Sequence, residues 1–155
     1  MHPYVSEALQ AVQKEQLLQE ADVAHFSPTD FRQGIQWLLS ENQDDLAQAL
    51  ADAGLSLHPH NQEVLAMAGL LAMTREDWPL AVELLQDLYA VQGDQTQPMT
   101  YQMLARAHFC NLQRAEAVQV LTAALLAWPE DAMLLEELSC LGPEFNFPGT
   151  SNLHH

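Results

Sequence analysis

Apolar residues recur at helical spacing along most of this chain, and short polar breaks divide them into runs. In the stretch 5–26 the apolar positions fall on one face of a helix, as expected for a helix that packs on one side. They are Val5, Ala8, Leu9, Val12, Leu17 and Ala21. The pattern predicts an N-terminal helix followed by further helices of similar length.

Two later segments, 28–59 and 98–129, follow one pattern. Each has a helical run, a polar break ("SENQDD" or "CNLQRA"), a second helical run that contains alanine, and a closing proline. Phe31 corresponds to Tyr101, and Pro59 to Pro129. We interpret the two segments as copies of one helix-turn-helix unit, because fixed-period similarity is the mark of repeat proteins.

The intervening segment, 62–93, fits the same frame. Leu65 takes the place of the aromatic residue, Gly69 falls at the eighth position, and Ala81 corresponds to Ala47 and Ala117. Two extra residues in "GDQTQP" separate this unit from the third, and loops tolerate such insertions at little cost. The sequence therefore predicts three units of about 34 residues.

Each unit contains the residues that a stacked helix pair needs. We expect the small alanine where two helices cross, and the proline to prevent the second helix from continuing. Ser27, Pro28 and Asp30 predict a capped helix start. The stretch 131–142 predicts a last short helix that ends at Gly142-Pro143. One pair cannot bury its apolar face alone, so neighbouring pairs must stack.

These features resemble the tetratricopeptide repeat (TPR), whose pattern includes an alanine four residues before a phenylalanine and a closing proline. The matching residues are Gly69, the three alanines, Pro59 and Pro129, whereas Ala51, Leu85 and Leu121 replace the usual phenylalanine and Gly93 replaces one proline. The resemblance implies an all-α fold of three degenerate TPR helix pairs in a short right-handed superhelix. The expected boundaries are an N-terminal helix (1–27), TPR 1 (28–61), TPR 2 (62–97), TPR 3 (98–131), a capping helix (132–142) and a flexible tail (143–155).

The formal charge of −16 disfavours nucleic acid and anionic membrane surfaces as partners. It would attract a basic partner, although solubility is the simpler explanation of the acidity. No apolar run is long enough to span a bilayer, so we expect no membrane insertion and a cytoplasmic protein. Cys110 and Cys140 are expected to be reduced, partly buried thiols.

The sequence contains no motif for catalysis or nucleotide binding, so we predict neither an enzyme nor a cofactor. His58 and His60 flank Pro59 in a predicted turn, and no third ligand stands at metal-site spacing, so no metal site is predicted. His108 and Cys110 point to different helix faces. The acidic pairs in 43–45, 75–77 and 135–138 are expected in turns or on an outer face.

In TPR proteins the first helix of each repeat lines a concave groove, through positions 2, 5, 9 and 12. By this resemblance Thr29 and Glu63, at position 2 of their repeats, also face the groove. The candidate partner-binding residues are Arg32, Gln36, Leu39, Ala66, Leu70, Met73, Met99, Gln102, Arg106 and Phe109.

This groove composition favours an apolar client. Its cations are Arg32 and Arg106, and the chain has a single lysine, Lys14, so the Lys-rich clamp that other TPR domains use for acidic tails is not expected. Leu39, Leu70, Met73, Met99 and Phe109 form a candidate apolar strip. Exposed apolar strips mark binding sites, and methionine suits adaptable recognition. Gln36, Gln102 and Arg106 are expected to hydrogen-bond the backbone of the client.

Size, acidity and the order of helices resemble the class II, TPR-type chaperones of bacterial type III secretion. The resemblance implies a cytosolic chaperone that holds an apolar segment of a secreted translocator, or of a needle or export component. Two other interpretations stay open. One is a TPR adaptor for folded proteins, and the other is a self-associating protein, such as a homodimer, whose groove its own N-terminal helix fills.

Overall fold

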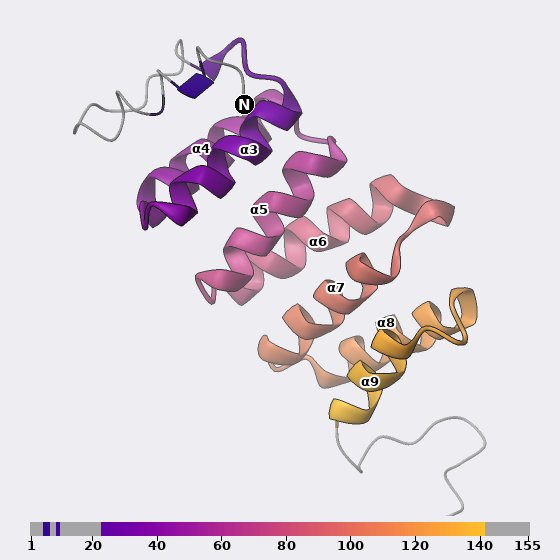
Figure 1. Cartoon of the computed structure of the whole chain (residues 1–155). Helices are drawn as coiled ribbons and strands as arrows, with labels where there is room; N and C mark the ends of the chain where they lie inside the picture. Colours follow the sequence, from indigo (N-terminus) through magenta and orange to yellow (C-terminus); the bar gives the residue numbers. More distant parts are fainter. Residues whose placement is uncertain (1–4, 7–8, 10–22, 142–155) are drawn as a thin grey trace, which may run out of the picture. The chain divides into compact units, whose positions relative to one another are not determined.

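The computed structural model describes Val5, Ser6, Leu9 and residues 23–141 of the 155-residue chain. The described part is all α-helical apart from turns and one short 3-10 helix, and Figure 1 shows the helices packed in pairs within each part. Most of the predicted N-terminal helix and the whole predicted tail, 143–155, lie outside the described residues. Helices are numbered as in Figure 1.

The chain divides into two compact units, Met1–Gly93 and Asp94–His155. The first contains α3 (Pro28–Ser40), α4 (Asp44–Leu57), α5 (Gln62–Thr74) and α6 (Trp78–Gln92). Here α3 packs on α4, α5 packs on α6, and α5 also contacts both α3 and α4. Two helix pairs therefore stack on each other within this unit.

The second unit contains α7 (Pro98–Cys110), α8 (Arg114–Ala127) and α9 (Ala132–Cys140), and the 3-10 turn η1 (Gly93–Gln95) precedes it. Helices α7 and α8 form the third pair, and α9 packs on both of them. The predicted helix pairs and the closing helix are thus confirmed.

The helix starts follow from local side-chain chemistry. Ser27 Oγ accepts from the backbone N–H of Asp30 at 3.1 Å, and Asp30 Oδ2 accepts from the N–H of Ser27 at 2.9 Å. This reciprocal pair is a capping box, with Pro28 as the first helical residue, and it confirms the capped helix start that the sequence predicts. Asn61 caps α5 and Asp131 caps α9 in a related way, through their side-chain oxygens.

The turn inside each helix pair has the same backbone geometry despite different residues. Its central residue has a left-handed φ of 59°, 59° and 61° in Asn42, Glu76 and Leu112. The next residue donates its N–H to a carbonyl five positions back, as in a Schellman motif. These bonds are Gln43 to Leu38 (2.8 Å), Asp77 to Ala72 (2.9 Å) and Gln113 to His108 (2.8 Å).

Small residues allow the paired helices to approach closely. Ala47, Ala81 and Ala117 are fully buried, as the repeat pattern predicts. A Cβ on Gly69 of α5 would lie 2.8 Å from Leu85 Cδ2 of α6, so the Leu85 side chain would have to move. Neighbouring side chains must therefore make room for any volume added at these positions, since packed interiors contain few voids.

In the first and third helix pairs, a ring nitrogen at the end of the second helix contacts a backbone carbonyl just before the first helix. His58, which caps α4, places Nε2 3.2 Å from the carbonyl oxygen of Phe26, just before α3. Trp128 caps α8 and donates its indole N–H to the carbonyl of Thr96, also at 3.2 Å, just before α7. Both residues directly precede the closing prolines. Because a backbone carbonyl oxygen can only accept, His58 Nε2 is the donor in this hydrogen bond.

We expect Ala81→Leu and Ala117→Leu each to lower the free energy of unfolding by about 1–3 kcal/mol, because the added carbons overpack a helix crossing. Ala90→Leu on the exposed side of α6 is the matched control and should change it by less than about 0.5 kcal/mol. Urea unfolding followed by circular dichroism measures all three. Equal effects at Ala81 and Ala90 would contradict the crossing geometry.

Leu112→Gly should raise the free energy of unfolding by about 0.5–1 kcal/mol. Leu112 is 94% exposed, so little packing is lost, and glycine removes the left-handed backbone strain of a residue with a Cβ. Gln86→Gly, at an exposed position in the middle of helix α6, should instead lower it by about 0.5–1 kcal/mol. Denaturant midpoints that shift in the same direction for both variants would refute the turn assignment.

Candidate functional site

The candidate residues on α3 lie on one face of that helix. Arg32, Gln36 and Leu39 are spaced i, i+4, i+7, so their side chains follow one stripe. Gln36 is exposed, and Arg32 and Leu39 are half-buried. The buried residues of α3 are Phe31, Gly34, Ile35 and Leu38.

The candidate residues on α5 form a second stripe with the same spacing. Leu70 is 45% exposed, and Ala66 and Met73 are half-buried. Most of the rest of α5 is buried, because this helix packs against α3, α4 and α6. An exposed leucine on such a helix leaves apolar surface for a partner.

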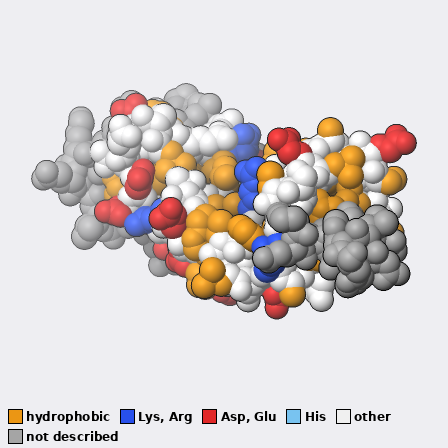
Figure 2. Space-filling model, turned by 90° about the horizontal axis from the view of Figure 1, so that it is seen from below, with side chains coloured by type: hydrophobic (Ala, Val, Ile, Leu, Met, Phe, Trp, Pro, Cys, Tyr) orange, Lys and Arg blue, Asp and Glu red, His pale blue; other side chains and the backbone are white. Residues whose placement is uncertain are grey.

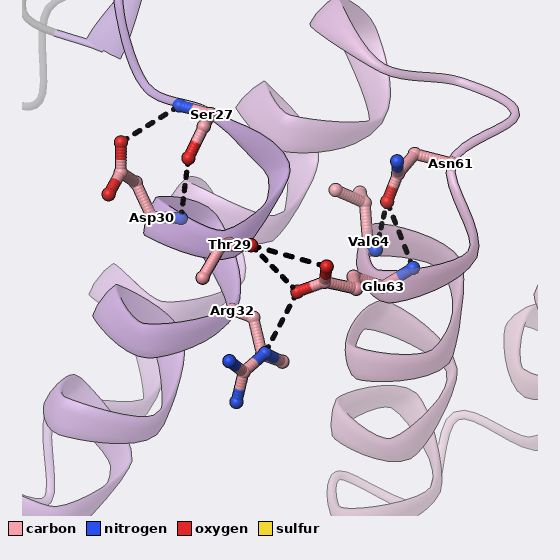
Figure 3. A network of polar contacts seen from close by, with 7 residues as sticks. All are labelled: Ser27, Thr29, Asp30, Arg32, Asn61, Glu63 and Val64. Atoms are coloured by element: carbon pink, nitrogen blue, oxygen red, sulfur yellow. Dashed lines mark hydrogen bonds and ion pairs between the residues drawn. The ribbon is translucent and has the colours of Figure 1, made fainter.

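Polar contacts hold α3 and α5 side by side in the same direction. Near the helix starts, Arg32 Nε donates to Glu63 Oε2 at 3.0 Å, and the hydroxyl of Thr29 donates to the same carboxylate (Figure 3). At the other end of α5, its C-cap residue Arg75 pairs with Asp45, in the first turn of α4, at 3.1 Å. The two stripes are therefore neighbours, and Leu39, Leu70 and Met73 make up what we call the apolar patch of unit 1.

The charge of Arg32 is compensated within the protein. Its guanidinium shares Glu63 with Thr29, and both ends of the ion pair are partly exposed, at 36% and 43%. An exposed pair of this kind adds little to stability, but it leaves no free cation for an acidic client. This contact explains physically why a carboxylate clamp is not expected on α3.

The four candidate residues on α7 belong to the second unit and form a set of their own. Met99 is 55% exposed and Phe109 is 41% exposed. Between them, Gln102 Nε2 and Arg106 Nε donate to Glu137 Oε1 of α9, at 2.8 Å and 2.7 Å. The hydrogen bond to Glu137 raises the pKa of Arg106 and outweighs the opposing effect of partial burial. Gln102 and Arg106 thus already have partners.

Glu137 is the residue that the sequence reasoning placed wrongly. Its acidic pair was expected in a turn or on an outer face, but its side chain is only 11% exposed. It lies 31 residues after Arg106, the same spacing as Arg32 to Glu63. That recurring spacing, applied to the third repeat, would have identified it.

His108 and the two cysteines lie at or near the ends of their helices. His108 is buried, and its Nδ1 lies 2.9 Å from Gln113 Oε1 in the turn after α7. Cys110 and Cys140 are free and exposed, so the expectation of partly buried thiols is wrong, because both stand at helix ends. Within residues 23–141 and the few described before them, no group of three or more potential ligands could hold a metal ion.

Figure 2 shows exposed hydrophobic side chains lying among acidic ones on one face of the molecule. In the part of the chain that the structure describes, every helix is too short or too polar to cross a bilayer.

No family model matches this chain, and no curated protein matches it. Among solved structures it is similar to "MamA RS-1 ArsTM double mutant", with a TM-score of 0.66 and 16% identity over 91% of this chain and 84% of that chain. MamA contains TPRs. At this identity the likeness shows the fold alone. The described part of the chain is therefore all-α and TPR-like.

A double-mutant cycle of Arg106→Gln and Glu137→Gln should give a coupling energy of about 0.5–1 kcal/mol that falls as salt is added. The cycle of Arg75→Gln and Asp45→Asn should give less than about 0.5 kcal/mol, since the Asp45 side chain is 96% exposed. Unfolding in urea at two salt concentrations measures both. Equal coupling in the two cycles would contradict the partly buried position of Glu137.

Proposed function

We propose that this protein is a non-catalytic binding module that holds apolar segments of another protein on the exposed stripes of its first helices, in each unit by itself. The observation that carries the proposal is the exposure of Leu70, Met99 and Phe109, at 45%, 55% and 41%. Each belongs to a stripe of α5 or α7 whose helix is otherwise largely buried. Covering one such side chain contributes about 1.5–3 kcal/mol.

The finer form of the proposal is a chaperone of the type III secretion kind. It would hold an apolar segment of a translocator, or of a needle or export component, that otherwise aggregates or assembles too early. The net charge of −16 would keep the complex soluble. Holding of this kind needs no nucleotide, and the TPR-like fold is typical of non-catalytic scaffolds.

One contact bears on the self-filled alternative. A Cβ on Gly34 would lie 3.1 Å from Leu9 Cδ1, so Leu9 packs beside Gly34. Gly34 is two residues after Arg32 and therefore on the opposite side of α3 from the stripe. At Leu9 the N-terminal segment thus covers the other face of α3, which supports a stripe open to a partner.

The chaperone and adaptor forms differ in what they do to the partner. Affinity capture from the native cell extract, with mass spectrometry, identifies candidate clients. Co-expression then tests them: a chaperone's client is insoluble alone and soluble with this protein, whereas an adaptor's partners are soluble without it. A client whose solubility does not depend on this protein would refute the chaperone form.

Leu70→Glu and Phe109→Glu should each weaken client binding at least tenfold, because a buried carboxylate without a partner opposes the apolar contact. Helix content should stay nearly unchanged, since both positions are exposed. Leu57→Glu, at a 38% exposed position on the second helix α4, is the matched control and should bind normally. Titration of labelled client measures binding, and retention of binding in both variants would refute the proposal.

A further inference from the structure

The apolar patch of unit 1 lies at one end of its two helices. Leu39 is the second-last residue of α3, and Met73 is the second-last residue of α5. Toward the helix starts the stripes become polar, where Arg32 and Glu63 neutralise each other. A bound segment would therefore place its apolar side chains next to the turns that follow α3 and α5.

Those turns are strongly acidic. Glu41, Asp44, Asp45, Glu76 and Asp77 are all exposed there. The one cation, Arg75, already binds the Asp45 carboxylate and the carbonyl of Asp44. The described part of this edge therefore offers no free positive charge to repel a cationic partner.

Two of these carboxylates stand where a helix disfavours them. Glu41 caps the C-terminus of α3, and Glu76 follows the C-terminal cap of α5, where the helix dipole presents negative charge. By contrast, Asp44 and Asp45 lie in the first turn of α4, and Asp77 caps α6, where the dipole favours them. Neither Glu41 nor Glu76 makes an ion pair or side-chain hydrogen bond with another described residue.

Both glutamates stand in the turns that follow the patch residues along the chain. Glu41 is two residues after Leu39, at the C-terminal cap of α3, and Glu76 is three residues after Met73, in the turn after α5. The Debye length is about 8–10 Å at physiological ionic strength, so salt only partly screens a charge in these turns from a segment bound on the patch. A cation held there would be attracted by two carboxylates that no other described residue pairs.

We propose that the segment bound on the apolar patch of unit 1 is cationic: Leu, Met or Phe side chains cover the patch, and adjacent Lys or Arg side chains lie near Glu41 and Glu76. This inference rests on the proposed function and adds the charge of the client to it. Charge complementarity of this kind sets specificity and association rate more than total affinity.

Two synthetic peptides test the proposal on the full-length protein. They share one central Leu/Met/Phe sequence and carry two Lys or two Glu residues at each end. At 50 mM NaCl the Lys peptide should bind at least tenfold more tightly than the Glu peptide, and the difference should shrink at 300 mM NaCl. Equal binding, or tighter binding of the Glu peptide, would overturn the inference.

A matched pair of variants separates a local effect from net charge. Glu41→Gln with Glu76→Gln should reduce the preference for the Lys peptide at least threefold. Glu83→Gln with Asp87→Asn removes the same charge from exposed positions on α6 and should leave the preference nearly unchanged. An equal reduction in both double variants would mean that only total charge matters, which overturns the inference.

Leu70→Glu distinguishes this failure from failure of the proposed function. If it weakens both peptides while the Lys preference is absent, the binding surface stands and the cationic client is refuted. If it weakens neither peptide, or neither peptide binds the unaltered protein, the proposed binding surface fails, and the inference fails with it.

Discussion

The structure depends on how closely the two helices of each pair approach. Ala47, Ala81 and Ala117 are fully buried at equivalent positions, and a Cβ on Gly69 would require the Leu85 side chain to move. Close approach turns one face of each first helix into core, as in α5, where seven residues are buried. The second helix of the pair does not cover the remaining stripe of the first helix, so packing within the pair does not fix which residues stand on that stripe.

The turns show how different residues produce one geometry. Asn42, Glu76 and Leu112 all adopt the left-handed conformation, although only asparagine accepts it readily. The helix ends require it, because the Schellman bonds satisfy carbonyls that would otherwise lack partners. His58 and Trp128 likewise use different rings for one task, binding the backbone carbonyl before the first helix of their own pair. The repeats therefore share backbone geometry and contacts more closely than they share residues.

Ion pairs between helices shape the candidate binding surface. Arg32 of α3 meets Glu63 of α5, and Arg106 of α7 meets Glu137 of α9, each across 31 residues. Both pairs compensate the charge of an arginine on a stripe. What is left for a partner is apolar surface in each unit, and in unit 1 this surface lies beside acidic turns whose charge is only partly compensated. Apolar contact and local charge therefore act on neighbouring parts of the same bound segment.

The sequence by itself determined the features that depend on near neighbours. Helical periodicity predicted the helices, and Ser27, Pro28 and Asp30 predicted the capped start of α3. The alanines and prolines predicted the repeat, because each of these features acts within a turn or one helix pair. Tertiary structure decided which side chains pair across 31 residues, how deeply Glu137 is buried, and that Cys110 and Cys140 are exposed. These depend on the rotation and offset of packed helices, which a helical pattern leaves open. The tertiary structure therefore also decided which stripe residues bond within the protein and which stay exposed.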